Sequence, residues 1–137
     1  MASEFFWDTS GLFALLNSDD PAHERARRFI AASSSKRRRS FTTEWVIGEC
    51  CTLLIARKRS HVVPKFLDIL DRSGSLTTIH VDQNAILSTK MFLRKHLDQG
   101  YSFTDCTSFV VMRERNILDA MTADAHFEQA GFRALLI

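Results

Sequence analysis

The chain has 137 residues, of which 45% are hydrophobic and 25% are charged, with only 5 Gly and 2 Pro. This composition is typical of a folded domain and excludes a collagen or a disordered tail, and the length predicts a single domain over residues 1–137. The net charge of +2 is too balanced to indicate a nucleic-acid partner by itself. The positions of the charges therefore matter more than their sum.

The cysteines and the apolar segments indicate the cellular compartment to expect. Three cysteines, two of them adjacent at 50 and 51, make no paired disulfide framework and suit a reducing compartment. The longest apolar stretches, such as those at 12–16, 109–112 and 134–137, are far shorter than the roughly 20 residues of a membrane span. The first residues also lack the basic start and apolar core of a signal peptide. We therefore expect a cytoplasmic protein with no membrane segment.

The first half of the chain predicts two strands and three helices. An aromatic run at 4–7 predicts a strand, and apolar spacing from Leu12 onward predicts a helix. Pro21 fits the first position of a second helix that reaches Ile30, and the polar segment 33–39 predicts a loop. Residues 40–43 predict a brief strand. Residues 44–56 are apolar around most of a helical circumference, so we expect a largely buried helix there.

The second half continues the alternation. Helices are predicted over 64–71, 83–96 and 104–115, and strands over 76–81, over 117–121 and from Phe132. A turn at 122–124 precedes a short helix through Phe127. Repeated strand and helix units of this kind predict an α/β fold, with a mostly parallel sheet covered by helices on both faces.

Four acids occupy unusual positions in this layout: Asp8 ends the first strand, Glu49 lies within an apolar helix, Asp105 opens a helix, and Asp124 follows a later strand. The carboxyl ends of parallel strands line the crevice where ligands bind, and Asp8 and Asp124 fall there directly. Taken singly, Asp8, Asp105 and Asp124 are also explained as a helix cap, a first-turn acid and a turn residue. Glu49 is harder to explain that way, because its apolar neighbours predict burial and a buried carboxylate needs a partner.

Carboxylates packed together raise one another's pKa values unless a cation neutralises them. Oxygen ligands favour Mg²⁺ or Mn²⁺ over zinc. The histidines show no zinc-type spacing, so surface or packing roles are expected for His23, His61, His80, His96 and His126. Small core-filling roles are expected for Cys50, Cys51 and Cys106, and core positions for Phe103, Phe109, Phe127 and Phe132.

Four short motifs, in their order and spacing, resemble those of the PIN-domain ribonucleases, specifically the VapC toxins of bacterial toxin-antitoxin pairs. The motifs are WDTS at 7–10, TTEWVIGE at 42–49, YSFTDC at 101–106, and TADAHF at 122–127 with Gly131 and Phe132 after it. The resemblance covers nearly the whole chain and implies a three-layer α/β/α PIN-like domain. It assigns metal binding and catalysis to Asp8, Glu49, Asp105 and Asp124, and polar supporting roles to Thr9, Ser10, Ser102 and Thr122. Glu44 lies on a different helical face from Glu49, so we expect it to be a helix-start acid.

The activity that this resemblance implies is metal-dependent endoribonuclease activity, in which Mg²⁺ or Mn²⁺ activates water against an RNA phosphodiester bond. It also implies a cognate antitoxin that masks the acidic crevice, and a homodimer whose two sites share a basic groove. An acidic site needs cations at its rim to hold RNA. The candidates are Lys36, Arg37, Arg38, Arg39, Arg57, Lys58 and Arg59, to which Arg25, Arg27 and Arg28 could add. Solvated loops and helix ends are the alternative explanation for these residues.

Three other functions compete with this one. A haloacid dehalogenase-type phosphotransferase needs a second aspartate where Ser10 stands, and a receiver domain needs a late lysine, but no lysine follows Lys95. The stronger alternative is a noncatalytic PIN-like module that binds RNA or protein. Four retained acids argue against this alternative.

Overall fold

The computed structural model describes residues 4–137. Within these residues five strands form one sheet in the order β3-β2-β1-β4-β5, and every neighbouring pair is parallel. The strands are β1 (Phe5–Trp7), β2 (Ser40–Thr43), β3 (Leu76–Ile79), β4 (Asp119–Met121) and β5 (Arg133–Ala134). The parallel sheet that the sequence predicts is confirmed.

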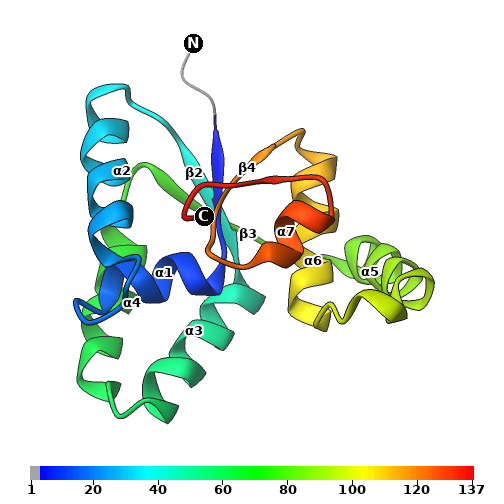
Figure 1. The fold of residues 1–137 in the computed structure, drawn as a ribbon, viewed down its shortest axis with the longest axis horizontal. Coiled ribbons are helices and arrows are strands. Elements are labelled where there is room, and N and C mark those ends of the chain that lie inside the picture. Colours follow the sequence, from blue (N-terminus) through cyan, green and yellow to red (C-terminus); the bar gives the residue numbers. More distant parts are fainter. Residues whose placement is uncertain (1–3) are drawn as a thin grey trace.

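Helices cover the sheet on both sides. They are α1 (Thr9–Leu16), α2 (His23–Ser35), α3 (Glu44–Ala56), α4 (Val63–Arg72), α5 (Gln83–Lys95), α6 (Phe103–Glu114) and α7 (Ala125–Gln129), with 3-10 turns η1 (Ser60–Val62) and η2 (Leu97–Gln99). In Figure 1, α1, α2 and α4 lie to the left of the strands and α5, α6 and α7 to the right. The sheet is therefore the middle layer of an α/β/α arrangement. Over residues 4–137, no helix combines the length and the apolar character that crossing a bilayer requires.

The core lies on both faces of the central strands. Every residue of β1, β2 and β4 is buried. A parallel strand buried on both faces reads as a continuous apolar run, which explains the FFW sequence of β1. On the α6 and α7 side, the ring of Phe109 packs against those of Phe127 and Phe132, with centroid separations of 4.9 and 5.5 Å. The core roles expected for these three phenylalanines are confirmed, whereas Phe103 is only half-buried.

At β1, the order in which the chain adds strands to the sheet changes direction. Strands β2 and β3 extend from one edge of β1, and β4 and β5 extend from the other. In open parallel sheets, ligands bind outside the carboxyl ends of the strands at this reversal. Trp7 and Met121 are paired as the last residues of β1 and β4, so Asp8 and Thr122 follow directly at that point.

Gly11 permits α1 to lie against the end of β4. A Cβ atom at Gly11 would lie 1.9 Å from the carbonyl oxygen of Met121, a distance at which any side chain clashes. The backbone N–H of Asp8 donates to the same carbonyl at 3.3 Å. This close approach brings the start of α1 beside the segment that follows β4.

The predicted loop at 33–39 is wrong for its first three residues. Helix α2 begins at His23, two residues after Pro21, and continues through Ser35. The hydroxyls of Ser34 and Ser35 donate to the carbonyls of Ile30 and Ala32, so polar side chains that favour a loop instead bond back to the last turn of the helix.

Helix α3 is not the largely buried helix that its composition predicts. Its buried residues are Val46, Cys50 and Leu54, and Trp45 and Ile55 are 39% and 59% exposed. The short strands and the neighbouring helices α1 and α6 cover only one side of α3. Cys50 and Cys106 are buried as expected, but Cys51 is only partly buried.

Candidate active site

Asp8 is buried at the carboxyl end of β1. It occupies the N-cap position of α1, but its side chain makes no capping hydrogen bond. Its Oδ2 instead accepts from the hydroxyl of Thr122 at 2.8 Å and from that of Ser10 at 3.1 Å. Burial raises the pKa of this carboxyl from 3.8 to about 7, and the charge of Asp105 adds to the rise, although the hydrogen bonds oppose it. A helix cap does not explain this aspartate.

Thr122 joins the segments that follow β1 and β4. Its fully buried hydroxyl donates to Asp8 and accepts the backbone N–H of Asp124 at 3.0 Å. The hydroxyl of Ser10 accepts the backbone N–H of Ala123 at 3.0 Å and lies 2.9 Å from that of Thr122. These bonds fix the position of Asp8 relative to Asp124.

Asp105 lies in the first turn of α6 and is also buried. It forms a capping box with Ser102: the Ser102 hydroxyl accepts the N–H of Asp105 at 3.0 Å, and Asp105 Oδ2 accepts the N–H of Ser102 at 3.3 Å. Burial raises the pKa of Asp105, and the charges of Asp124 and Glu49 raise it further. The first-turn position left open for this residue is real, but it accompanies a site in which other acids surround the carboxylate.

Glu49 reaches the site from α3. It is half-buried, and not fully buried as its apolar neighbours predict, because the outer side of α3 is open. Its Oε1 accepts the hydroxyl of Thr9 at 2.5 Å. Since Thr9 follows Asp8 in the chain, this bond ties Glu49 to the start of α1.

Glu44 has a different role in the same helix. It is the first residue of α3, and its Oε1 accepts the backbone N–H of Val81 at 2.8 Å and lies 3.0 Å from Nδ1 of His80. The helix-start position expected for Glu44 is confirmed. Its contacts tie α3 to the segment after β3.

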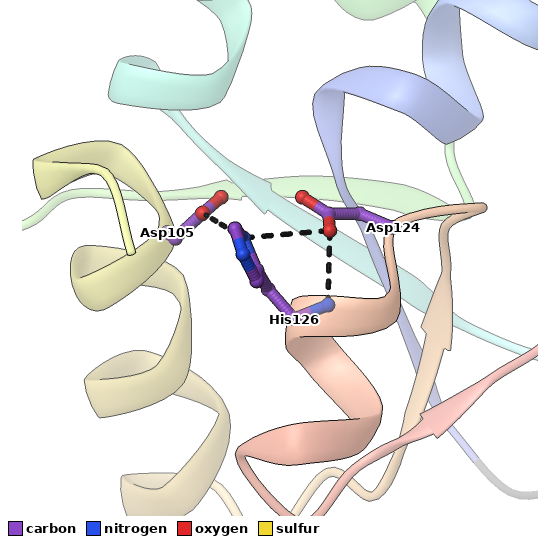
Figure 2. A group of neighbouring side chains, drawn as sticks. All are labelled: Asp105, Asp124 and His126. Atoms are coloured by element: carbon purple, nitrogen blue, oxygen red, sulfur yellow. Dashed lines mark hydrogen bonds and ion pairs between the residues drawn. The ribbon is translucent and has the colours of Figure 1, made fainter. Parts of the chain in front are cut away.

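His126 lies between two of the acids. Asp124 caps α7 by accepting the N–H of His126 at 2.9 Å, and Nδ1 of His126 is 3.5 Å from both Asp105 Oδ2 and Asp124 Oδ1 (Figure 2). One ligand atom from each of these three residues lies within 4.8 Å of the other two. The sequence alone predicts only a surface or packing role for His126. Histidine spacing gave no signal because the partners are acids, and the available signal was the position of His126 two residues after Asp124.

The four acids come from four separate segments and interact at one edge of the sheet. The charge of Asp105 raises the pKa of Asp8, and the pKa of Asp105 itself is raised by Asp124 and Glu49. Within the described chain, the close group of ligand atoms contains Asp105 and Asp124 but neither Asp8 nor Glu49. Carboxylate oxygens suit Mg²⁺ or Mn²⁺, and an imidazole nitrogen is a further metal ligand, so this donor set fits a divalent cation.

The two basic segments lie at different places. One segment precedes β2, at the amino ends of the parallel strands and so opposite the acids, and it contains Lys36, Arg37, Arg38 and Arg39. The other segment follows α3, the helix that carries Glu49, and it contains Arg57, Lys58 and Arg59. Arg38 makes structural contacts: its guanidinium pairs with Asp119 at 3.1 Å and lies 5.0 and 4.9 Å from the ring centroids of Phe5 and Phe29. Arg59 pairs with Asp19 at 2.6 Å. In α2, Arg25 donates to the carbonyl of Leu136, and Arg27 and Arg28 flank Glu24.

A cavity of about 550 Å³ lies away from the acids. Its walls come from α1, α2, α4 and the starts of the strands, and none of the four acids lines it. The acidic site at the carboxyl ends of the strands does not coincide with this cavity.

Comparison with known proteins agrees with the fold. Residues 5–133 match the PIN domain family model. The 23S rRNA-specific endonuclease VapC20 of Mycobacterium tuberculosis H37Rv is 35% identical over 127 residues, covering 93% of this chain and 94% of that protein, and the CDC 1551 / Oshkosh strain gives the same values. A crystal structure of Mycobacterium tuberculosis VapC20, described as a sarcin-ricin loop cleaving toxin, matches with a TM-score of 0.84 and 34% identity, covering 93% of this chain and 95% of that one. The chain therefore belongs to the PIN-domain family, and to the VapC proteins within it.

Proposed function

We propose that this chain is a metal-dependent endoribonuclease and the toxin component of a type II toxin-antitoxin system. The observation that carries the proposal is the convergence of Asp8, Glu49, Asp105 and Asp124 at the reversal point of a PIN-family sheet. These four acids are the proposed metal-binding and catalytic residues, with Mg²⁺ or Mn²⁺ as the ion. His126 joins the proposed donor set because of its distances to Asp105 and Asp124.

The donor set itself supports a cation site. Asp8 is a buried carboxylate with two hydroxyl partners and no cationic side chain among its described contacts. Its raised pKa means that ionisation costs free energy in the metal-free protein, and a bound dication would offset that cost. When bound, such an ion supplies a Lewis acid that polarises the phosphodiester and lowers the pKa of water.

Hydroxyl side chains position the carboxylates of the acidic site. Thr122 and Ser10 hold the Asp8 carboxylate in one orientation, Thr9 holds that of Glu49, and Ser102 fixes Asp105 through the capping box. A carboxylate locked in this way costs little to order when substrate arrives. The four hydroxyl residues are therefore proposed as positioning groups.

The substrate and the partners are proposed from the relatives. VapC20 is named as a 23S rRNA endonuclease, and we extend RNA, with that rRNA as the first substrate to test, to this chain. A cognate antitoxin, a homodimer and a cytoplasmic location belong to the same proposal. So does a single domain over residues 1–137, which the family match over 5–133 supports.

The decisive experiment is incubation of the purified protein with total bacterial RNA, in parallel with Mg²⁺, with Mn²⁺ and with chelator. We expect discrete cleavage with either metal, and none with chelator or with the Asp105→Asn variant. A Glu114→Gln variant is the matched control, because Glu114 is an exposed carboxylate at the opposite end of α6, the helix that carries Asp105.

Binding of RNA by the wild-type protein without any cleavage would favour the noncatalytic PIN-like module. Cleavage that survives in both the chelator and the Asp105→Asn reactions would instead show that these acids do not form the active site.

A further inference from the structure

Trp45 is a large aromatic side chain left open to solvent beside the acidic site. It is 39% exposed, whereas the other tryptophan, Trp7, is 4% exposed. Trp45 precedes Glu49 by four residues, so one turn of α3 places both side chains on the same face. Both residues line one shallow groove, whose described lining residues are Glu44, Trp45, Gly48, Glu49, Thr52 and Thr104. We call this the Trp45 groove.

Phe103 packs against the indole ring of Trp45. The ring centroids of Trp45 and Phe103 lie 5.0 Å apart at an interplanar angle of 42°. Phe103 begins α6 and lies two residues before Asp105. The aromatic pair therefore spans the two helices that carry Glu49 and Asp105, and its exposed face borders the site where RNA would be cut.

The residues that line the groove suit the base of a nucleotide and not its phosphate. Its lining contains two carboxylates and no lysine or arginine, so a phosphate gains nothing by entering it. Single-stranded RNA is commonly held by stacking of its bases on aromatic side chains, an interaction that needs no cation and tolerates any base. An exposed indole flanked by hydroxyl and carboxylate groups fits the face and the edge of a nucleobase.

We propose that Trp45 is a stacking site for the base of a nucleotide adjacent to the scissile phosphate, with Phe103 as the positioning residue beneath it. This inference rests on the proposed ribonuclease function, because it takes RNA as the substrate. A purine has a larger stacking face than a pyrimidine, so the site favours adenine over uracil.

The test measures RNA affinity in an Asp8→Asn background with Mg²⁺, so that the RNA stays intact. The probes are fluorescein-labelled oligoadenylate and oligouridylate about ten nucleotides long, a length within the usual site size for single strands. We expect Trp45→Ala to weaken oligoadenylate binding about tenfold and to remove most of the preference over oligouridylate. Trp45→Phe retains most of the affinity, whereas Trp45→Leu behaves like Trp45→Ala, because leucine keeps bulk but has no aromatic face.

Intrinsic fluorescence gives an independent readout. RNA should quench tryptophan emission in the background protein but not in its Trp45→Phe variant, where the buried Trp7 alone emits. Ile55→Ala is the matched control: Ile55 is exposed on the same helix but absent from the groove lining, and its loss should leave both readouts unchanged. Thermal unfolding of each variant verifies that the fold is retained.

Two results would overturn the inference. The first is unchanged oligoadenylate affinity and quenching in folded Trp45→Ala protein. The second is conversion of a dimer to a monomer by Trp45→Ala while Trp45→Leu stays dimeric, which would make Trp45 a contact between copies of the chain. Quenching by RNA from a wild-type protein that cuts no RNA would leave the stacking site standing and refute only the nuclease proposal.

Discussion

Asp8 is a carboxyl group that the fold stabilises in its protonated form. Desolvation raises its pKa to about 7, and the hydrogen bonds from Thr122 and Ser10 lower it only in part. A carboxyl whose pKa is higher in the folded protein than in the unfolded chain binds its proton more tightly when folded. The free energy of unfolding therefore falls as the pH rises from about 4 to about 7.

The first prediction concerns this pH window. In chelator, we expect the wild-type protein to lose roughly 3 kcal/mol of unfolding free energy between pH 4 and pH 7 through Asp8, and little more from this group above pH 7. Asp8→Asn removes the ionisation, so the variant is more stable than the wild-type protein at pH 8 and its dependence on pH is flatter. Urea unfolding at pH 4, 5.5, 7 and 8 measures the difference, and parallel curves for the two proteins would contradict it.

His126 leads to a second prediction at the same scale. Its Nδ1 atom is 3.5 Å from carboxylate oxygens of both Asp105 and Asp124, a spacing compatible with neighbouring ligands of one ion. Imidazole nitrogen strengthens binding of Mn²⁺ more than binding of Mg²⁺. We expect His126→Ala to weaken Mn²⁺ binding about tenfold and Mg²⁺ binding much less.

Calorimetric titration of the metal-free protein with each ion measures this ratio. His96→Ala is the matched control, because Nδ1 of His96 bonds to the carbonyl of Phe92 on α5 and touches none of the acids. An equal loss for both ions, or no loss for either, would show that His126 is not a ligand.

At the scale of elements, capping groups and one glycine decide how the acids meet. Asp105 and Asp124 each accept a backbone N–H at a helix start, whereas Asp8, for which a helix cap is the local explanation, makes no capping hydrogen bond. Local sequence predicts the first two contacts because their partners lie within three residues. Asp8 has one local partner, Ser10, but its shorter hydrogen bond comes from Thr122, 114 residues away, and only the pairing of β1 with β4 creates that contact.

Gly11 gives the prediction at this scale. Since a Cβ atom there would lie 1.9 Å from a backbone oxygen that cannot move without disturbing β4, Gly11→Ala pushes α1 away from the sheet. We expect a loss of about 3 kcal/mol or more in unfolding free energy and a loss of divalent-metal affinity, because Ser10 and Thr122 separate. Gly48→Ala is the control, since no atom lies within 4 Å of the Cβ position in α3. Denaturant unfolding of both variants compares them, and equal stabilities would refute the role of Gly11.

At the scale of the whole molecule, periodicity and motif order predict most of the fold, and burial is where sequence reasoning fails. The strand and helix alternation is confirmed because each segment carries its own apolar pattern. The burial of α3 is not, because hydrophobic composition does not reveal how many neighbours the tertiary structure supplies, and Trp45 and Ile55 stay exposed. Arg38 was grouped with its basic neighbours by sequence alone, and its contacts with Phe5, Phe29 and Asp119 form only once β1, α2 and β4 have packed.

The positions of the two basic segments lead to the last prediction. RNA bound at the carboxyl edge of the sheet lies on the side from which α3 departs, and Arg57 and Lys58 are exposed at the end of that helix, about 12 Å along the axis from Glu49. Arg37 and Arg39 are exposed at the opposite edge. Each phosphate neutralised by a cation contributes to the salt dependence of the binding constant. We therefore expect Arg57→Ala with Lys58→Ala to weaken RNA binding and to flatten its dependence on salt.

Arg37→Ala with Arg39→Ala is the matched comparison, since it removes the same charge from the other edge and should change neither quantity by much. Fluorescence anisotropy with oligoadenylate from 50 to 200 mM salt measures both pairs in the Asp8→Asn background. If the Arg37 and Arg39 pair instead carried the salt dependence, the RNA would have to run along the helical layers from one edge of the sheet to the other. The acids would then face the middle of a long bound strand, and shortening the oligonucleotide would weaken its binding steeply.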